Sequence, residues 1–393
     1  MKRTLRFMAL GIAIAVTSAG CAAATQNSSN EDSAVSATVQ EDSAVSATVE
    51  AALKALEGTV NGTDPNGIKP SSFADTELSD DEISQIQALK MKAGVAMHSM
   101  SDAWSVQLVA GLESEFKRLG IELVGVTDAE NDPAKQSTQI ETLLAAKPDF
   151  IVTLPTDPVA MEGAYRKAVD AGVKLVFSTL VPNGFTGGTD YVSMVSDDRF
   201  GSGLVSGYQL AKAIGGKGEV GIIFHDADNF TTKQSYLGVL QALKEFPGIT
   251  IYEQGIVGPD FAGDAQAATN ALLTKYPNLA GAWGVWDLPA EGIMAAARAA
   301  GRQDLKITTI GFGQNVGLSM AKNEFITGLS AIDSFSEGEA EARLGAAAVL
   351  GKSGLPVFVA SQPIQVNHSN LLESWSIVYH EDAPSILTDA FVK

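Results

Sequence analysis

Residues Thr127–Phe177 read TDAENDPAKQSTQIETLLAAKPDFIVTLPTDPVAMEGAYRKAVDAGVKLVF, and this stretch decides the fold. Asp132-Pro133 and Asp157-Pro158 each predict the start of a helix, because an Asp side chain caps free backbone amides and Pro suits the first helical position. Phe150–Leu154, between them, is an apolar run typical of a strand. The stretch therefore predicts strand, helix, strand, helix, which is the order of a parallel α/β sheet.

Each predicted helix in this stretch carries an apolar stripe at the spacing of a buried face. The stripe residues are Ile140, Leu143 and Leu144 in the first helix and Met161, Tyr165, Ala168 and Val169 in the second. Gly172 follows the second stripe and predicts the end of that helix.

Strand-like runs continue along the chain at the interval of βα units. They begin near Ala93, Ile121, Phe150 and Lys174, so successive starts are 28, 29 and 24 residues apart. After a break at 182–197 the strand-like runs are Glu219–Phe224, Ile249–Tyr252, Gly281–Trp286 and Lys306–Phe312, and the helical patterns between them include Gln234–Lys244 and Ala290–Ala300. Because 393 residues exceed the usual size of a single core, we expect two α/β lobes, each with a parallel sheet.

The N-terminus predicts export. Lys2, Arg3 and Arg6 precede the apolar run Phe7–Val16, which is too short to span a bilayer and is typical of a signal peptide, here expected over 1–20. Cys21 is the only cysteine, so no internal disulfide is expected. Its position resembles a bacterial lipobox and predicts lipid attachment at Cys21, although that motif usually has Leu where Ser18 stands. The alternative is ordinary signal-peptide cleavage among the alanines that follow.

Residues 21–90 have the composition of a flexible tether. Ser, Ala, Thr, Asn and acidic residues dominate, and the run Glu31–Val39 recurs at Glu41–Val49. Near the end of this segment, Ser79 and Glu82 have the spacing of a capping box and predict a short helix before the first strand. We therefore expect an acidic, lipid-anchored tether that carries the folded body.

The charge of the chain argues against a nucleic-acid partner. The formal net charge of −19 becomes −22 when the three signal-peptide cations are removed, and 12 acidic against 3 basic residues give the tether −9. Such a chain is repelled by phosphate backbones, and no stripe of basic residues interrupts this pattern.

Motifs of catalysis and cofactor binding are missing from the sequence. Gly351-Lys352-Ser353 is not a phosphate loop, because Ala346 stands where the motif needs Gly and the run Glu337–Leu350 before it is helical. No G-x-S-x-G elbow occurs. The histidines lack a metal spacing and are His98, His225, His368 and His380. We therefore expect no enzymatic activity, no metal and no cofactor.

Polar and aromatic residues gather where the predicted strands end, which is where open α/β sheets bind ligands. The segments are His98–Trp104, His225–Phe230, Trp286-Asp287 and Gly313–Asn315. Aromatic rings beside carboxylates and amides suit a sugar or polyol, whose C–H faces pack on rings while its hydroxyls need polar partners. Structural roles remain open: Asp102 as a helix cap, and Trp104, Phe230 and Trp286 as core residues. We interpret Asp128 and Asp157 as turn and cap residues.

The chain resembles the ribose-type sugar-binding proteins that serve ABC importers. The motifs that carry the resemblance are Asn131–Gln136, Leu154–Asp157, Gly281–Asp287 and Ile310–Gly313, and it covers roughly Lys92–Val378. It implies a type I periplasmic binding protein, with two Rossmann-like lobes joined by a three-crossover hinge and a ligand in the cleft. Related repressors carry an N-terminal helix-turn-helix where this chain has a signal sequence and tether, so that branch is not expected.

The resemblance also implies the division into lobes and the partners. The N-terminal lobe is expected to comprise 91–196 and 332–360, and the C-terminal lobe 197–331 and 361–393. The implied partners are a sugar or polyol and an ABC permease, with the protein a monomer at the outer face of the membrane or in the periplasm. Two alternatives remain: a ligand-binding component of a sensory or chemotactic receptor, and an exported α/β enzyme acting on carbohydrates.

The site residues of the family carry over only in part. Trp104 matches the family's aromatic wall, with Asp102 near its usual Asn. The family's Asp-Arg clamp falls on Thr179-Leu180 and is missing, and its helix arginine falls near Ser235. The complete candidate set is His98, Asp102, Trp104, Thr179, Asp226, Asn229, Phe230, Gln234, Phe261, Trp286, Asp287 and Gln314. Loss of the charged clamps favours a polyol or deoxy sugar over ribose or glucose.

Overall fold

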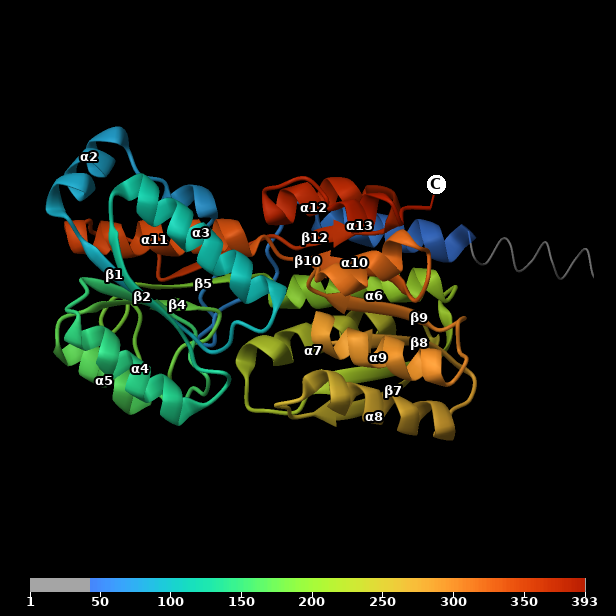
Figure 1. Ribbon diagram of the computed structural model, residues 1–393. Coiled ribbons are helices and arrows are strands. Elements are labelled where there is room, and N and C mark those ends of the chain that lie inside the picture. Colours follow the sequence, from blue (N-terminus) through green and yellow to red (C-terminus); the bar gives the residue numbers. More distant parts are fainter. Residues whose placement is uncertain (1–42, 393) are drawn as a thin grey trace, which may run out of the picture. The chain divides into compact units, whose positions relative to one another are not determined.

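The computed structural model describes residues 43–392, and the residues from Ala44 onward form one compact unit. Within this part of the chain there are two six-stranded sheets, each with helices on both faces (Figure 1). We refer to each sheet with its helices as a lobe.

The N-terminal lobe is built on a fully parallel sheet of strand order β11-β5-β4-β3-β1-β2. Its strands are β1 (Lys92–Met97), β2 (Glu122–Asp128), β3 (Phe150–Thr153), β4 (Lys174–Ser178), β5 (Ser193–Asp197) and β11 (Phe358–Ser361). One face is covered by α3 (Ala103–Leu119) and α11 (Ser334–Leu350), and the other by α4 (Pro133–Ala145) and α5 (Glu162–Asp170).

The C-terminal lobe has the strand order β12-β10-β9-β8-β6-β7. Its strands are β6 (Lys217–His225), β7 (Gly248–Ile256), β8 (Leu279–Gly284), β9 (Lys306–Ile310), β10 (Ile326–Ala331) and β12 (Ile364–Val366). One face carries α6 (Arg199–Ala213) and α7 (Phe230–Lys244), and the other carries α8 (Phe261–Lys275), α9 (Asp287–Ala299) and α10 (Gln314–Ala321). The C-terminal helices α12 (Leu371–Tyr379) and α13 (Ser385–Thr388) pack against the core under α8–α10.

These sheets confirm the predicted fold class. The chain passes from one sheet to the other after β5, after β10 and after β11, which are the crossovers of the expected hinge. The short edge strand β12 differs from the expectation because it runs antiparallel to β10. It enters the sheet directly from β11, with no crossover helix to reverse its direction.

Of the two predicted helix starts, one is confirmed and one is wrong. Asp132 caps α4 by accepting hydrogen bonds from the amides of Ala134 (2.8 Å) and Lys135 (3.2 Å). Asp157 instead closes a turn through the amides of Val159 and Ala160, and α5 begins only at Glu162. Aspartate bonds its own backbone two residues on as readily as it caps a helix, so the sequence alone did not separate the two.

The pair α3 and α11 packs with its backbones in close contact. A Cβ added to Gly111 would lie 2.0 Å from the carbonyl oxygen of Phe335, and one added to Gly338 would lie 2.2 Å from that of Leu108. Glycine at both positions therefore permits the approach. This packing fixes the first turns of α11, just after a crossover, against the first turns of α3.

The segment expected as a tether is folded from residue 44 onward. A helix over 43–56 buries Val49 and Leu53 against the core of α6 and α7. The backbone amides of Asn61 (2.5 Å) and Gly62 (2.9 Å) then donate to the carboxylate of Asp198, which caps α6. The expectation of a flexible tether reaching residue 90 is therefore wrong, because apolar side chains in this polar segment find a partner surface.

The predicted capping box of Ser79 and Glu82 is confirmed at the start of α2 (Asp80–Leu89), which packs beside α11 and α3. The signal peptide expected over 1–20 and the lipidation expected at Cys21 lie outside the described residues. Among the helices that are described, none is both long and apolar enough to cross a bilayer.

Candidate functional site

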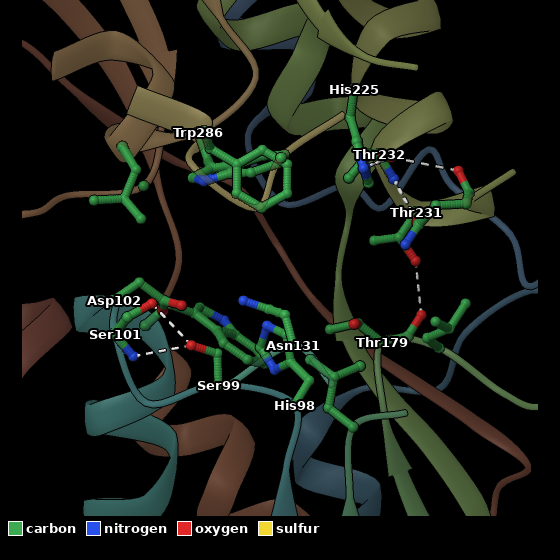
Figure 2. A pocket seen from close by; sticks show the side chains of 18 of the residues that line it. His98, Ser99, Ser101, Asp102, Asn131, Thr179, His225, Thr231, Thr232 and Trp286 are labelled. Atoms are coloured by element: carbon green, nitrogen blue, oxygen red, sulfur yellow. Dashed lines mark hydrogen bonds between the residues drawn. The ribbon is translucent and has the colours of Figure 1, made fainter. Parts of the chain in front are cut away.

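The candidate site is a pocket of about 600 Å³ lined by residues of both lobes. Its walls come from residues at and after the carboxyl ends of β1 to β5 in the N-terminal lobe and of β6 to β10 in the C-terminal lobe, and from the end of α12. Figure 2 shows side chains of the two lobes facing each other across this space. The carboxyl ends of the strands in both sheets therefore converge on one cavity, as the sequence predicted.

Most of the candidate site residues lie in this pocket. The ones that line it are His98, Asp102, Trp104, Thr179, Asn229, Phe261, Trp286 and Asp287. The ones that do not are Asp226, Phe230, Gln234 and Gln314.

These four residues lie outside the pocket because of where the neighbouring helix begins or the loop turns. Asn229 caps α7, so Phe230 and Gln234 lie one turn apart on a face that lines a second, much smaller cavity. Asp226 is exposed, with its side chain against Gly255 of the neighbouring strand. Gln314 is the first residue of α10 and points to solvent.

The N-terminal wall is formed by the start of α3. Asp102 caps this helix, and its Oδ1 accepts a hydrogen bond of 2.8 Å from the Ser105 amide. The expected structural role of Asp102 is thus present together with its place in the pocket. Trp104 packs against the cores of both lobes, and its Nε1 donates to Oε2 of buried Glu337 at 3.1 Å. The indole is therefore fixed in orientation where it lines the pocket.

The C-terminal wall is a cluster of three rings. Phe261 and Trp286 meet edge to face with centroids 4.8 Å apart, and His225 lies 5.5 Å from Phe261 and 5.6 Å from Trp286. Phe261 follows β7, Trp286 follows β8 and His225 is the last residue of β6. Such a cluster offers a rigid apolar and aromatic surface to a ligand.

Thr179 joins the two lobes at the base of the pocket. Its φ of +52° is in the left-handed region, which a β-branched residue rarely adopts. In this conformation its carbonyl oxygen accepts a hydrogen bond of 2.8 Å from Oγ1 of Thr231 in α7 (Figure 2). A backbone outlier that faces a ligand pocket is typical of functional sites.

Replacing Thr231 by valine is expected to weaken this connection between the lobes. The side chain keeps its shape but loses the hydroxyl, so the closed arrangement loses a hydrogen bond worth about 1 kcal/mol. We expect a larger radius of gyration in X-ray scattering without ligand and an affinity for ligand reduced by about fivefold. Thr274→Val is the matched control, because Thr274 bonds a carbonyl within one helix. Equal scattering and affinity in the two variants would contradict the prediction.

Burial sets the protonation of the pocket's titratable groups. The pKa of His98 is lowered by burial, which outweighs the opposing effects of Asp102 and Asp128, and the pKa of His225 is lowered by burial against Asp226. Both imidazoles are therefore neutral at pH 7. The pKa of Asp287 is raised to about 7 by burial, then by the negative charges of Asp102 and Glu291.

The structure adds pocket residues that the sequence did not single out. Arg199 lines the pocket and forms an ion pair of 2.5 Å with fully buried Asp197, although the pair is not aligned as a hydrogen bond. Asp197 ends β5 and Arg199 begins α6, and β5 lies beside β4, the strand after which the family clamp is missing. Further lining residues are Ser99, Ser101, Gln107, Asn131, Thr156, Asp157, Asp228, Thr232 and Tyr379.

Signals for some of these residues were present. Asp157 and Asn131 belong to the turns that carry the resemblance, and the sequence predicts only a turn or cap role for Asp157. Arg199 had a weaker signal, because β5 reads Ser-Met-Val-Ser-Asp and lacks a long apolar run.

The lining groups supply ring faces, carboxylate acceptors, hydroxyls and amides. These groups suit noncovalent capture of a small polar molecule. Within the part of the chain that the structure describes, no group of three or more His, Cys, Asp or Glu side chains is placed to hold a metal ion.

Comparison with known proteins agrees with this geometry. The model of the periplasmic binding protein domain matches residues 93–353. A putative rhizopine-binding protein of Rhizobium meliloti is 28% identical over 182 residues, which cover 46% of this chain and 59% of that protein. The ribose import binding protein RbsB of Bacillus subtilis (strain 168) is 28% identical over 199 residues, which cover 46% of this chain and 63% of that protein. The chain thus spans about 60% of the length of these two relatives.

A solved structure gives the same result. The solute-binding protein of an ABC transporter from Agrobacterium vitis, with bound allitol, superposes with a TM-score of 0.63 at 25% identity, covering 72% of this chain and 97% of that one. These matches confirm the resemblance found in the sequence. The chain belongs to the periplasmic binding protein family.

Proposed function

We propose that this protein is an extracytoplasmic solute-binding protein that captures a small sugar or polyol and delivers it to the permease of an ABC importer. The observation that carries the proposal is the pocket of about 600 Å³ between the two lobes, lined by Trp104 on one side and the Phe261–Trp286 pair on the other. This volume suits a small ligand. Relatives whose names specify ribose and a solved neighbour with bound allitol support the ligand class.

The mechanism is capture followed by closure. The ligand enters between the lobes, packs its C–H faces on the rings and bonds polar groups of both lobes. It therefore binds the closed arrangement more tightly and shifts the population toward it. The closed lobes then present a joint surface to the permease, and no covalent step takes part.

A panel of sugars and polyols tested by thermal unfolding examines this function. A ligand present at 100 times its dissociation constant should add about 2.7 kcal/mol to the free energy of unfolding. We expect at least one polyol or deoxy sugar to raise the melting temperature in proportion to the logarithm of its concentration. No shift with any sugar or polyol would contradict the proposal.

We further propose that the protein acts as a monomer held at the membrane by a lipid on Cys21. The apolar run before Cys21 and the small residues around it support this attachment. Mass spectrometry of the membrane fraction should find a diacylglyceryl group on Cys21, and Cys21→Ala should release the protein. Equal membrane retention of both forms would contradict the attachment.

A further inference from the structure

The pocket carries more negative than positive charge. Its carboxylates come from both lobes and are Asp102, Asp157, Asp228 and Asp287. Among its lining residues in the described part of the chain, Arg199 is the only Lys or Arg, and its charge is already paired with Asp197. With both histidines neutral, the pocket holds a surplus of carboxylates over cations.

Asp102 and Asp287 are the central carboxylates of this surplus. Asp102 is bonded by the amide and hydroxyl of Ser105 (2.8 and 3.1 Å), which are neutral donors of its own helix turn. Asp287 is 8% exposed and accepts from the amide of Leu288 at 3.0 Å. Neither carboxylate has an ion pair with a described residue at 4 Å or less.

The loop after β9 is shaped around Asp287. A Cβ added to Gly313 would lie 2.5 Å from Oδ2 of Asp287, and one added to Gly311 would lie 3.6 Å from its Cγ. A side chain at Gly313 would therefore collide with this carboxylate, whereas the distance at Gly311 is that of ordinary van der Waals contact. The same corner holds Tyr379, whose pKa is raised by burial, then by Asp287, Glu381 and Asp102. The carboxylates of this corner therefore act on one another without an intervening cation.

Aromatic rings flank this acidic corner. Asp287 directly follows Trp286, whose indole meets Phe261 at 4.8 Å and His225 at 5.6 Å. In Figure 2, Asp102 and Trp286 lie on opposite sides of the pocket. Carboxylates beside aromatic faces recognise positively charged nitrogen, because both the charge and the ring quadrupole attract it.

We propose that the ligand is an amino polyol or amino sugar, whose ammonium group lies between Asp102 and Asp287 beside Trp286. This inference rests on the proposed capture of a polyhydroxy ligand and specifies its charge. The hydroxyls of a neutral polyol can donate hydrogen bonds to both carboxylates, but a neutral polyol brings no positive charge to offset the repulsion between them. An ammonium group donates to both and also neutralises that repulsion, so it should bind more tightly at the same position.

Titration calorimetry with matched pairs of ligands tests the charge of the ligand. Each pair consists of a neutral compound and its analogue with one hydroxyl replaced by an amino group: glucitol and glucamine, inositol and aminodeoxyinositol, glucose and glucosamine. At pH 7.5 we expect the amino member of at least one pair to bind at least tenfold more tightly than its neutral partner. If the neutral member binds as tightly or more tightly in every pair, the inference is overturned while the proposed function stands. If no sugar or polyol of either kind binds, the proposed function fails as well.

Charge-neutralising variants locate the ammonium group. Asp287→Asn keeps the size of the side chain, and Asp102→Asn keeps a residue that caps helices well. We expect each variant to reduce at least tenfold the ratio of the affinity for the amino member to the affinity for its neutral partner. Asp81→Asn is the control, because Asp81 is exposed at the start of α2 and does not line the pocket. An unchanged preference in both pocket variants would overturn the placement even if amino ligands bind.

Discussion

Replacing Glu341 by glutamine is expected to raise the free energy of unfolding above that of the parent protein, by an amount that grows as the pH increases from 5 to 8.5. Glu341 lies in α11 with no exposed surface, and neither carboxyl oxygen has a hydrogen-bond partner of good geometry. Burial raises its pKa to about 8, and the hydroxyl of Ser178 opposes this effect. The folded protein therefore holds a proton on Glu341 at neutral pH.

The sign of the pH dependence follows from proton binding in the two states. Below the ordinary pKa of glutamate both folded and unfolded chains hold the proton, and Glu341 costs nothing in ionisation. Between that pH and about 8 the unfolded chain loses the proton while the folded chain keeps it, so stability falls as pH rises. From pH 5 to 8.5 the loss amounts to about 4 kcal/mol.

Glutamine has no proton to lose, so Glu341→Gln should lack this loss. The measurement is urea unfolding at several pH values, with the difference between variant and parent plotted against pH. A constant offset from placing an amide in this site cancels from the slope of that difference. Glu113→Gln, at an exposed position of α3, is the control. A flat difference for Glu341→Gln would show that Glu341 is ionised in the folded protein.

Glu341 belongs to a buried acidic layer beneath the pocket. Glu337, one turn earlier in α11, and Asp197, at the end of β5, have pKa values raised mainly by burial, and Arg199 is the cation that opposes the shift in both. Both α11 and Arg199 directly follow crossovers between the lobes. The protonation of this layer is therefore connected by contact to the segments about which the lobes would move.

Much of the fold could be predicted because local signals and tertiary structure agree. The cap at Asp132 and the apolar spacing of Ile140 and Leu143 are local features of the sequence, and the structure has both the capped helix and the buried stripe. The helix over 43–56 is the opposite case. It continues the Ser- and acid-containing repeat of the residues before it, although Val45, Val49 and Leu53 have the spacing of a helical stripe. Val49 and Leu53 are buried because α6 and α7 supply the surface. No local signal specifies that surface.

The sequence predicted the location of the pocket better than it predicted which side chains line it. The rule that ligands bind at the carboxyl ends of strands located Trp104, Phe261 and Trp286. Whether a loop residue faces the pocket depends on which residue caps the next helix. A shift of the cap by one residue changes the direction in which the neighbouring side chains point. Asn229 as the cap of α7 directs Phe230 away, and α10 beginning at Gln314 places that side chain in solvent.

Replacing Trp104 by alanine is expected to weaken ligand binding by at least about 30-fold, which corresponds to about 2 kcal/mol. The indole is half-buried, contacts the cores of both lobes and lines the pocket. Its removal takes away the ring on which the ligand packs. It also leaves Oε2 of Glu337 without the Nε1 donor at 3.1 Å, so part of the pocket wall loses its support.

Trp104→Phe separates these two contributions. Phenylalanine keeps a ring face but cannot donate to Glu337, so binding should weaken by less than tenfold if stacking dominates. Val106→Ala is the matched control, because Val106 lies on the same helix and is 45% exposed. Titration calorimetry with the ligand found by the thermal panel gives the affinities, and the melting temperature of each variant shows that it is folded. If folded Trp104→Ala binds that ligand as tightly as Val106→Ala does, Trp104 is not part of the binding wall, and the ligand must be held by the Phe261–Trp286 side alone.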